Sequence, residues 1–104
     1  MKTMIVGLSV AGLLFAGSVM AVDMPADGKS KCGACHTIDR KMVGPAWKDV
    51  AAKYKGQPDA EKTLVEHITK GGQFGWKMGM MPPKGMGASD AQIASLAKFI
   101  VDLK

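Results

Sequence analysis

The feature that most constrains this chain is a pair of cysteines, two residues apart, with a histidine directly after the second. Cys32, Cys35 and His36 include both cysteines of the 104-residue chain and one of its two histidines. This spacing brings two sulfur atoms and one imidazole to a single short segment. The rest of the chain must fold so that this segment faces whatever its three side chains bind.

The Cys-x-x-Cys-His pattern is typical of covalent haem attachment. In that chemistry each thiol adds across a haem vinyl group and becomes a thioether, and the adjacent histidine is held over the iron. Gly33 and Ala34 are small, so the chain can lie close to the porphyrin. The sequence therefore predicts one covalently attached haem c, bound through Cys32 and Cys35, with His36 as an axial ligand of the iron.

Three other uses of paired cysteines fit this sequence less well. An oxidoreductase Cys-x-x-Cys lies near a βαβ pattern, and the chain after residue 21 shows no strand-like alternation. A structural zinc site needs four ligands. Only Cys32, Cys35, His36 and His67 are available, and two of these residues are adjacent in the chain. A disulfide, which export would favour, leaves His36 without a role.

Residues 1–21 are interpreted as a signal peptide that is cleaved after Ala21. Residues 3–22 carry no charge, and the apolar run over residues 4–16 has the length of a signal-peptide hydrophobic region. A retained membrane anchor is the alternative, because a run of this length can just span a bilayer. The expected domain is therefore residues 22–104, located in the periplasm without stable membrane insertion after cleavage.

The charge of the chain bears on its partners. Lysine and arginine number 14 against nine aspartates and glutamates, a net charge of +5 with neutral histidines. Loss of the signal peptide and addition of two haem propionates lower this to about +2. Such a surface suits an acidic protein partner. No nucleic-acid partner is expected, because an exported chain rarely meets one.

The helix patterns predict an all-α domain. Four helices are expected, over residues 26–34, 46–54, 58–70 and 90–103. Asp23 and Ser89 are the expected N-caps of the first and last helices, and Gly71-Gly72 is expected to end the third. The last helix has an apolar face at helical spacing, formed by Ile93, Leu96, Ala97, Ile100 and Leu103.

Residues 71–87 have no helix or strand pattern, and so long a stretch in a small domain is usually functional. The second axial ligand can come from His67 or from a methionine of this stretch: Met78, Met80, Met81 or Met86. Met81 is favoured because it precedes Pro82-Pro83, which enforces extended geometry and stiffens the chain. The other methionines are interpreted as packing residues, and a Cu(I)-binding cluster is an alternative.

Histidine–methionine ligation raises the reduction potential, and filling both axial positions keeps substrates from the iron. The sequence therefore favours an electron carrier that is not an enzyme. A haem-based ligand sensor or peroxidase with an open sixth position is one alternative. A non-haem thiol or metal module is the other.

Three segments together resemble the small class I cytochromes c of bacteria, single-haem periplasmic carriers. They are Cys-Gly-Ala-Cys-His-Thr-Ile-Asp at 32–39, the stretch at 41–54, and Gly-Met-Met-Pro-Pro at 79–83. The resemblance covers about residues 26–104 and implies about four short helices wrapped around one haem, in a monomer. It also implies redox partner proteins: a donor such as a quinol-oxidising complex or another cytochrome, and an acceptor such as nitrite reductase or a terminal oxidase.

The resemblance implies roles for single residues as well. Met81 falls on the family's axial methionine. Pro45 matches the residue whose carbonyl accepts a hydrogen bond from the axial histidine and so orients His36. Trp76 matches an aromatic residue whose ring N–H reaches a haem propionate, with packing against the porphyrin as the alternative.

Two positions depart from the family pattern. His67 stands where relatives usually carry an arginine that pairs with a propionate, so a histidine here would couple the potential to pH. Lys84 stands where relatives often have an asparagine that donates to the methionine sulfur, and an ammonium would donate from a longer stem. Four lysines are expected to steer an acidic partner, unless they are ordinary solvated surface: Lys31, Lys41, Lys48 and Lys77.

Overall fold

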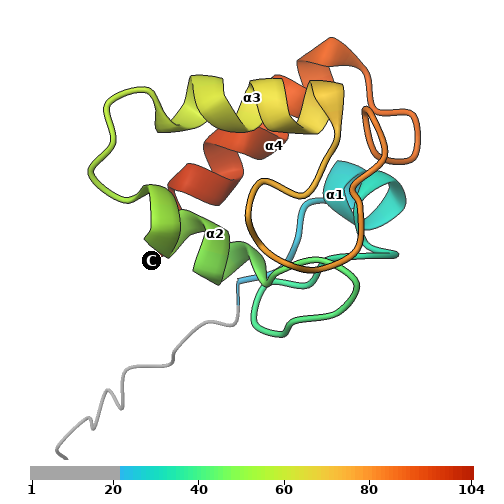
Figure 1. Ribbon diagram of the computed structural model, residues 1–104. Helices are drawn as coiled ribbons and strands as arrows, with labels where there is room; N and C mark the ends of the chain where they lie inside the picture. The colour runs from blue at the N-terminus through green and yellow to red at the C-terminus, as the bar shows by residue number, and fades with distance from the viewer. Residues whose placement is uncertain (1–21) are drawn as a thin grey trace, which may run out of the picture.

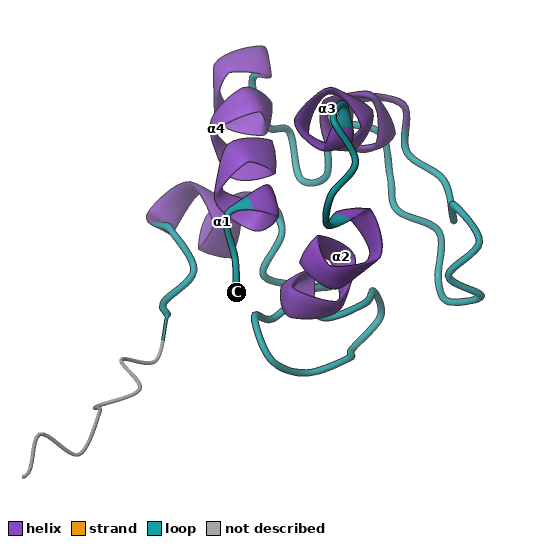
Figure 2. Ribbon diagram, turned by 90° about the vertical axis from the view of Figure 1, so that its left-hand side faces the viewer, coloured by secondary structure: helices purple, strands orange, loops and turns teal. Residues whose placement is uncertain are grey.

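The computed structural model describes residues 22–104, so the predicted signal peptide lies outside the described residues. Residues 22–104 form four helices and no strand: α1 (Ala26–Lys31), α2 (Trp47–Tyr54), α3 (Ala60–Lys70) and α4 (Asp90–Val101) (Figure 1). The all-α prediction is confirmed. Long loops join α1 to α2 and α3 to α4 (Figure 2). No helix within residues 22–104 combines the length and the apolar character that crossing a bilayer requires.

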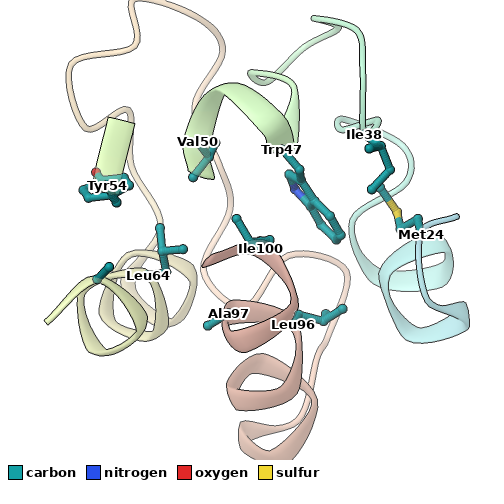
Figure 3. Close-up of a cluster of buried hydrophobic side chains, with 10 residues drawn as sticks. Met24, Ile38, Trp47, Val50, Tyr54, Leu64, Leu96, Ala97 and Ile100 are labelled. Carbon is teal, nitrogen blue, oxygen red and sulfur yellow. The ribbon is translucent and has the colours of Figure 1, made fainter. Parts of the chain in front are cut away.

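Helix α4 is the centre of the packing, because it contacts each of the other three helices. Its predicted apolar face is buried, with Ile93, Leu96, Ala97 and Ile100 at most 4% exposed. Figure 3 shows Ile100 beside Val50 and Trp47 of α2. Burial of these side chains supplies the main force that holds the helices together. Leu103 lies beyond the end of α4 and is half-buried.

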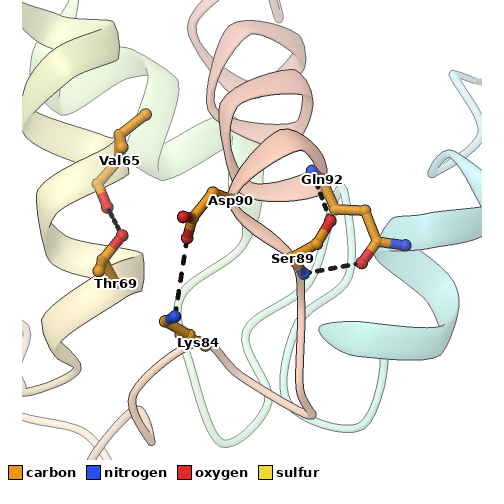
Figure 4. Close-up of polar contacts among 6 residues, drawn as sticks. All are labelled: Val65, Thr69, Lys84, Ser89, Asp90 and Gln92. Carbon is orange, nitrogen blue, oxygen red and sulfur yellow. Dashed lines mark hydrogen bonds and ion pairs between the residues drawn. The ribbon is translucent and has the colours of Figure 1, made fainter.

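The start of α4 agrees with its predicted cap. The Ser89 hydroxyl accepts a hydrogen bond from the Gln92 N–H at 3.2 Å, and the Gln92 side-chain oxygen accepts one from the Ser89 N–H at 2.9 Å (Figure 4). This reciprocal pair satisfies two backbone donors at the helix start. Gln92 also donates to the Asp27 carboxylate at 3.0 Å, which links α4 to α1.

The first helix is shorter than predicted. It ends at Lys31 rather than at residue 34, because among the described residues no backbone hydrogen bond continues the helical pattern from the N–H groups of Gly33 and Ala34. The N–H groups of Cys35 and His36 both donate to the Cys32 carbonyl, at 3.1 and 3.0 Å, in a separate turn that follows the helix. Asp23 is not the N-cap either: Pro25 holds that position, and no side chain caps the helix. The predicted bounds of the other helices differ by no more than two residues.

Helix α3 ends at Lys70, and Gly71 follows as its C-cap, as predicted. Gly71 has a φ of 71°, which glycine adopts readily and other residues adopt at a cost. Its N–H donates to the His67 carbonyl at 2.9 Å. The chain then leaves the helix towards α2 before it returns to α4 (Figure 1).

Candidate functional site

The two cysteines lie in the turn after α1. Both are half-buried free thiols, and both line the same cleft. Burial raises the pKa of the Cys32 thiol, and the neighbouring Cys35 adds to this effect. The turn therefore presents two thiols to one cavity, as attachment of a ligand at two points requires.

The imidazole of His36 is oriented by a backbone carbonyl. Its Nδ1–H donates to the Pro45 oxygen at 2.8 Å. Because a carbonyl only accepts, Nδ1 carries the proton and Nε2 keeps a free lone pair. Burial lowers the pKa of His36, and the bond to Pro45 opposes that shift. A neutral ring with a free Nε2 is the form that binds a metal.

Gly44 allows the chain to pass close to His36. A Cβ at this position would lie 2.9 Å from both ring nitrogens, which is closer than real Cβ atoms come. The Gly44 N–H donates to the Cys35 carbonyl at 2.8 Å. Gly44 was not among the predicted site residues, although a Gly-Pro pair before a helix start is a signal in the sequence.

The cleft encloses about 980 Å³, part of it open to solvent. Cys32, Cys35 and His36 form part of its wall, and much of the rest is apolar or aromatic: Val50, Leu64, Ile68, Phe74, Trp76 and Met81. A large apolar ring system, joined through two thioethers and bound through a metal, matches this donor set. The predicted haem therefore fits the residues present.

Met81 is held by its own backbone. The Gly72 N–H donates to the Met81 carbonyl at 2.9 Å, and the Met81 N–H donates back to Gly72 at 3.0 Å. The half-buried Met81 side chain packs against Ile68, Ala88 and Ile93 and also lines the cleft. Met80 and Met86 also line it, but they are 70% and 64% exposed. Met81 is thus held more firmly by the fold than either of these two methionines.

Lys84 does not take over the role of the asparagine that donates a hydrogen bond to the methionine sulfur in relatives. Its ammonium lies 3.7 Å from the Asp90 carboxylate at the start of α4 (Figure 4). Among the described residues, no hydrogen bond joins this ammonium to the Met81 sulfur. Instead, its backbone N–H donates to the Ile68 carbonyl at 2.7 Å, so Lys84 ties the chain after Met81 to α3.

His67 and Trp76 both line an aromatic part of the cleft. His67 stacks on Phe74, with ring centroids 3.7 Å apart and an interplanar angle of 9°. Its Nδ1 lies 3.4 Å from the Tyr54 hydroxyl. Tyr54 and Phe74 were not among the predicted site residues. Tyr54 follows Val50 by four residues on the buried face of α2, so the helical pattern contained a signal for it.

The four lysines expected at the cleft differ in their surroundings. Lys31 lines the cleft, and Lys41 and Lys77 are exposed. The Lys48 ammonium lies 2.6 Å from the Asp39 carboxylate. This pair partly cancels the charge of Lys48, which weakens its expected role in steering.

Comparison with known proteins identifies the family. The Cytochrome c family profile matches residues 26–104. The chain is 44% identical to cytochrome c-551 of Pseudomonas aeruginosa over 101 residues, which are 96% of this chain and 95% of that protein. It is 41% identical to cytochrome c-552 of Nitrosomonas europaea over 105 residues, the full length of both.

A solved structure agrees with these matches. The crystal structure of wild-type Nitrosomonas europaea cytochrome c552 superposes with a TM-score of 0.69 at 42% identity, covering 75% of this chain and 96% of that one. The expected class I fold and the single covalent haem are therefore confirmed. The chain belongs to the cytochrome c family: it is a small class I cytochrome that carries one covalently attached haem c and transfers electrons.

Proposed function

We propose that this cytochrome is a periplasmic single-electron carrier whose iron is ligated by His36 and Met81. The observation that carries the proposal is that both side chains line one cleft, while hydrogen bonds hold the His36 ring and the Met81 backbone in place. Pro45 orients the His36 ring, and Gly72 braces the Met81 backbone. When bound, the haem supplies a one-electron iron couple. Since both axial positions would be filled, the protein would act as a carrier and not as an enzyme.

The thiols of Cys32 and Cys35 would form the two thioethers, and Trp76 would donate its indole N–H to a propionate. Trp76 is half-buried and lines the cleft, which supports this assignment. A thioether is a weak ligand, so the chain must place it accurately. The Gly72 bonds on one side of Met81 and the Lys84–Ile68 bond on the other support such placement.

The proposed partners are redox proteins met in the periplasm: a quinol-oxidising complex or another cytochrome as donor, and nitrite reductase or a terminal oxidase as acceptor. The positive net charge supports an acidic partner. We expect a monomer with no nucleic-acid partner. Removal of residues 1–21 is part of the proposal, and mass spectrometry of the periplasmic protein should find a chain that begins at Val22.

The ligand assignment is tested by absorption spectra of the purified protein. A pyridine haemochrome assay should report haem c, and the oxidised protein should show the weak far-red band of ferric iron bound to methionine sulfur. Met81→Ala should abolish this band, whereas Met78→Ala and the matched change Met80→Ala should retain it. Loss of the band in Met80→Ala with retention in Met81→Ala would contradict the assignment. Rapid binding of CO by the unaltered protein would indicate an open iron site instead.

A further inference from the structure

Lys53, on the last turn of α2, contacts the aromatic part of the cleft from outside. Its ammonium donates to the Phe74 carbonyl at 3.2 Å and lies 4.5 Å from the centroid of the Trp76 ring. The same nitrogen is 5.8 Å from the Tyr54 ring. Lys53 forms no ion pair with any residue in the range 22–104. The Lys53 ammonium thus links α2, to which it belongs, to the loop that follows α3.

The loop at this point needs such a tie. Phe74 has a φ of 55°, a left-handed conformation that costs a non-glycine residue about 1–3 kcal/mol and persists only where the surroundings hold it. Two contacts hold Phe74: the Lys53 bond to its carbonyl and the His67 ring stacked on its side chain. The loop carries Trp76 two residues later and reaches Met81 after five more.

We propose that Lys53 is a positioning residue of the haem cleft: its ammonium fastens the Phe74–Trp76 segment to α2, and its charge favours the reduced cytochrome. A cation over an aromatic ring is attracted to the face of the ring, so Lys53 restrains the Trp76 indole directly. A fixed positive charge beside the cleft also favours the oxidation state that carries less positive charge. Lys53 therefore acts both mechanically and electrostatically.

The pKa of His67 depends in part on the charge of Lys53. Burial lowers the pKa of His67, the Glu66 carboxylate opposes this shift, and Lys53 and Lys70 add to it. Glu66 and Lys70 lie on α3 with His67. Lys53 and the Tyr54 hydroxyl face it from α2, and Phe74 covers its ring. Removal of the Lys53 charge must therefore raise the pKa of His67.

The proposal rests on the proposed electron-carrier function only through the reduction potential. Its test uses holo-cytochrome with Lys53→Met, which removes the charge and the donor but keeps an unbranched side chain. Lys53→Arg keeps both. Lys55→Met is the matched control, because Lys55 is exposed, lies just past the end of α2 and loses the same charge. Three quantities are measured: the potential, the pKa of His67 by NMR, and the exchange rate of the Trp76 indole proton.

Relative to Lys55→Met, we expect Lys53→Met to lower the potential, raise the His67 pKa and speed indole exchange. Lys53→Arg should remain close to the unaltered protein. The absence of any one of these three changes overturns the proposal. Should Lys53→Met fail to take up haem, Lys53→Gln provides the potential and pKa tests. The Lys53 proposal and the Met81 assignment can fail separately. Absence of the far-red band in the unaltered protein would contradict the Met81 assignment. The His67 titration and the indole exchange test the role of Lys53 whichever residue binds the iron.

Discussion

Met81 and Gly72 hold each other by two backbone hydrogen bonds, of 3.0 and 2.9 Å, in the part of the molecule where α3 gives way to the long loop. Gly71 directly precedes Gly72 and lies close to the backbone of residues 81–83. A Cβ on Gly71 would lie 2.7 Å from the Pro83 nitrogen and would also collide with the Met81 carbonyl. The end of α3 and the segment around Met81 therefore pack so closely that position 71 has room only for glycine.

Gly71→Ala is expected to destabilise the protein and to weaken the far-red band. The left-handed φ and the backbone collision together should cost about 1–3 kcal/mol of unfolding free energy, measured by denaturant titration. Gly56→Ala is the control, because Gly56 also has a positive φ, of 80°, but its Cβ would meet nothing within 4 Å. Equal effects of the two changes on the band would show that contact with the Met81 segment does not matter.

Gly44→Ala is expected to displace the His36 ring. The added methyl group would have to occupy the space of the imidazole, so the 2.8 Å bond to Pro45 should lengthen or break. Overpacking of this kind costs about 1–3 kcal/mol. The NMR signal of the His36 Nδ1 proton and the yield of haem-loaded protein measure the outcome. Gly79→Ala is the control, since its Cβ would come close only to the exposed Val43. An unchanged proton signal in Gly44→Ala would refute the prediction.

Ser89→Ala is expected to cost about 1 kcal/mol of stability, because the first turn of α4 loses its side-chain acceptor. Denaturant titration measures this loss. Ser95→Ala is the matched control, since Ser95 is exposed within the same helix. If both changes have the same effect, the reciprocal pair with Gln92 contributes nothing to stability.

The protonation of His67 should contribute to the pH dependence of the unfolding free energy. Its pKa is lowered from 6.5, mainly by burial, so between 6.5 and the folded value the unfolded chain binds a proton that the folded chain does not. Falling pH in that window therefore favours unfolding, while above about 6.5 the histidine is neutral in both states and has no effect.

Denaturant titrations of the holo-protein at several pH values test this expectation against His67→Gln. The unfolding free energy of the unaltered protein should fall more steeply as pH drops below 6.5. If the unfolding free energies of the two proteins change with pH in parallel, His67 is not the source of the steeper fall. The same variant shows whether His67 couples the reduction potential to pH, as the departure from the family's arginine suggests.

Much of the fold was predictable from short stretches of sequence. The apolar spacing of Ile93, Leu96, Ala97 and Ile100 and the cap at Ser89 are local patterns, and the structure confirms both. The end of α1 was predicted three residues too late, because the helical hydrogen-bond pattern stops at Gly33 and a separate turn follows at the attachment motif. Helix propensity in this stretch says nothing about that turn.

The sequence by itself determined the covalent haem and the helical class, since the spacing of Cys32, Cys35 and His36 and the period of α4 are properties of adjacent residues. Only the tertiary structure decided that the Lys84 ammonium turns to Asp90, that His67 stacks on Phe74, and that Lys53 reaches a carbonyl 21 residues away. The reason is physical: these contacts join separate segments, and the packing of α2, α3 and the following loop sets which side chains meet.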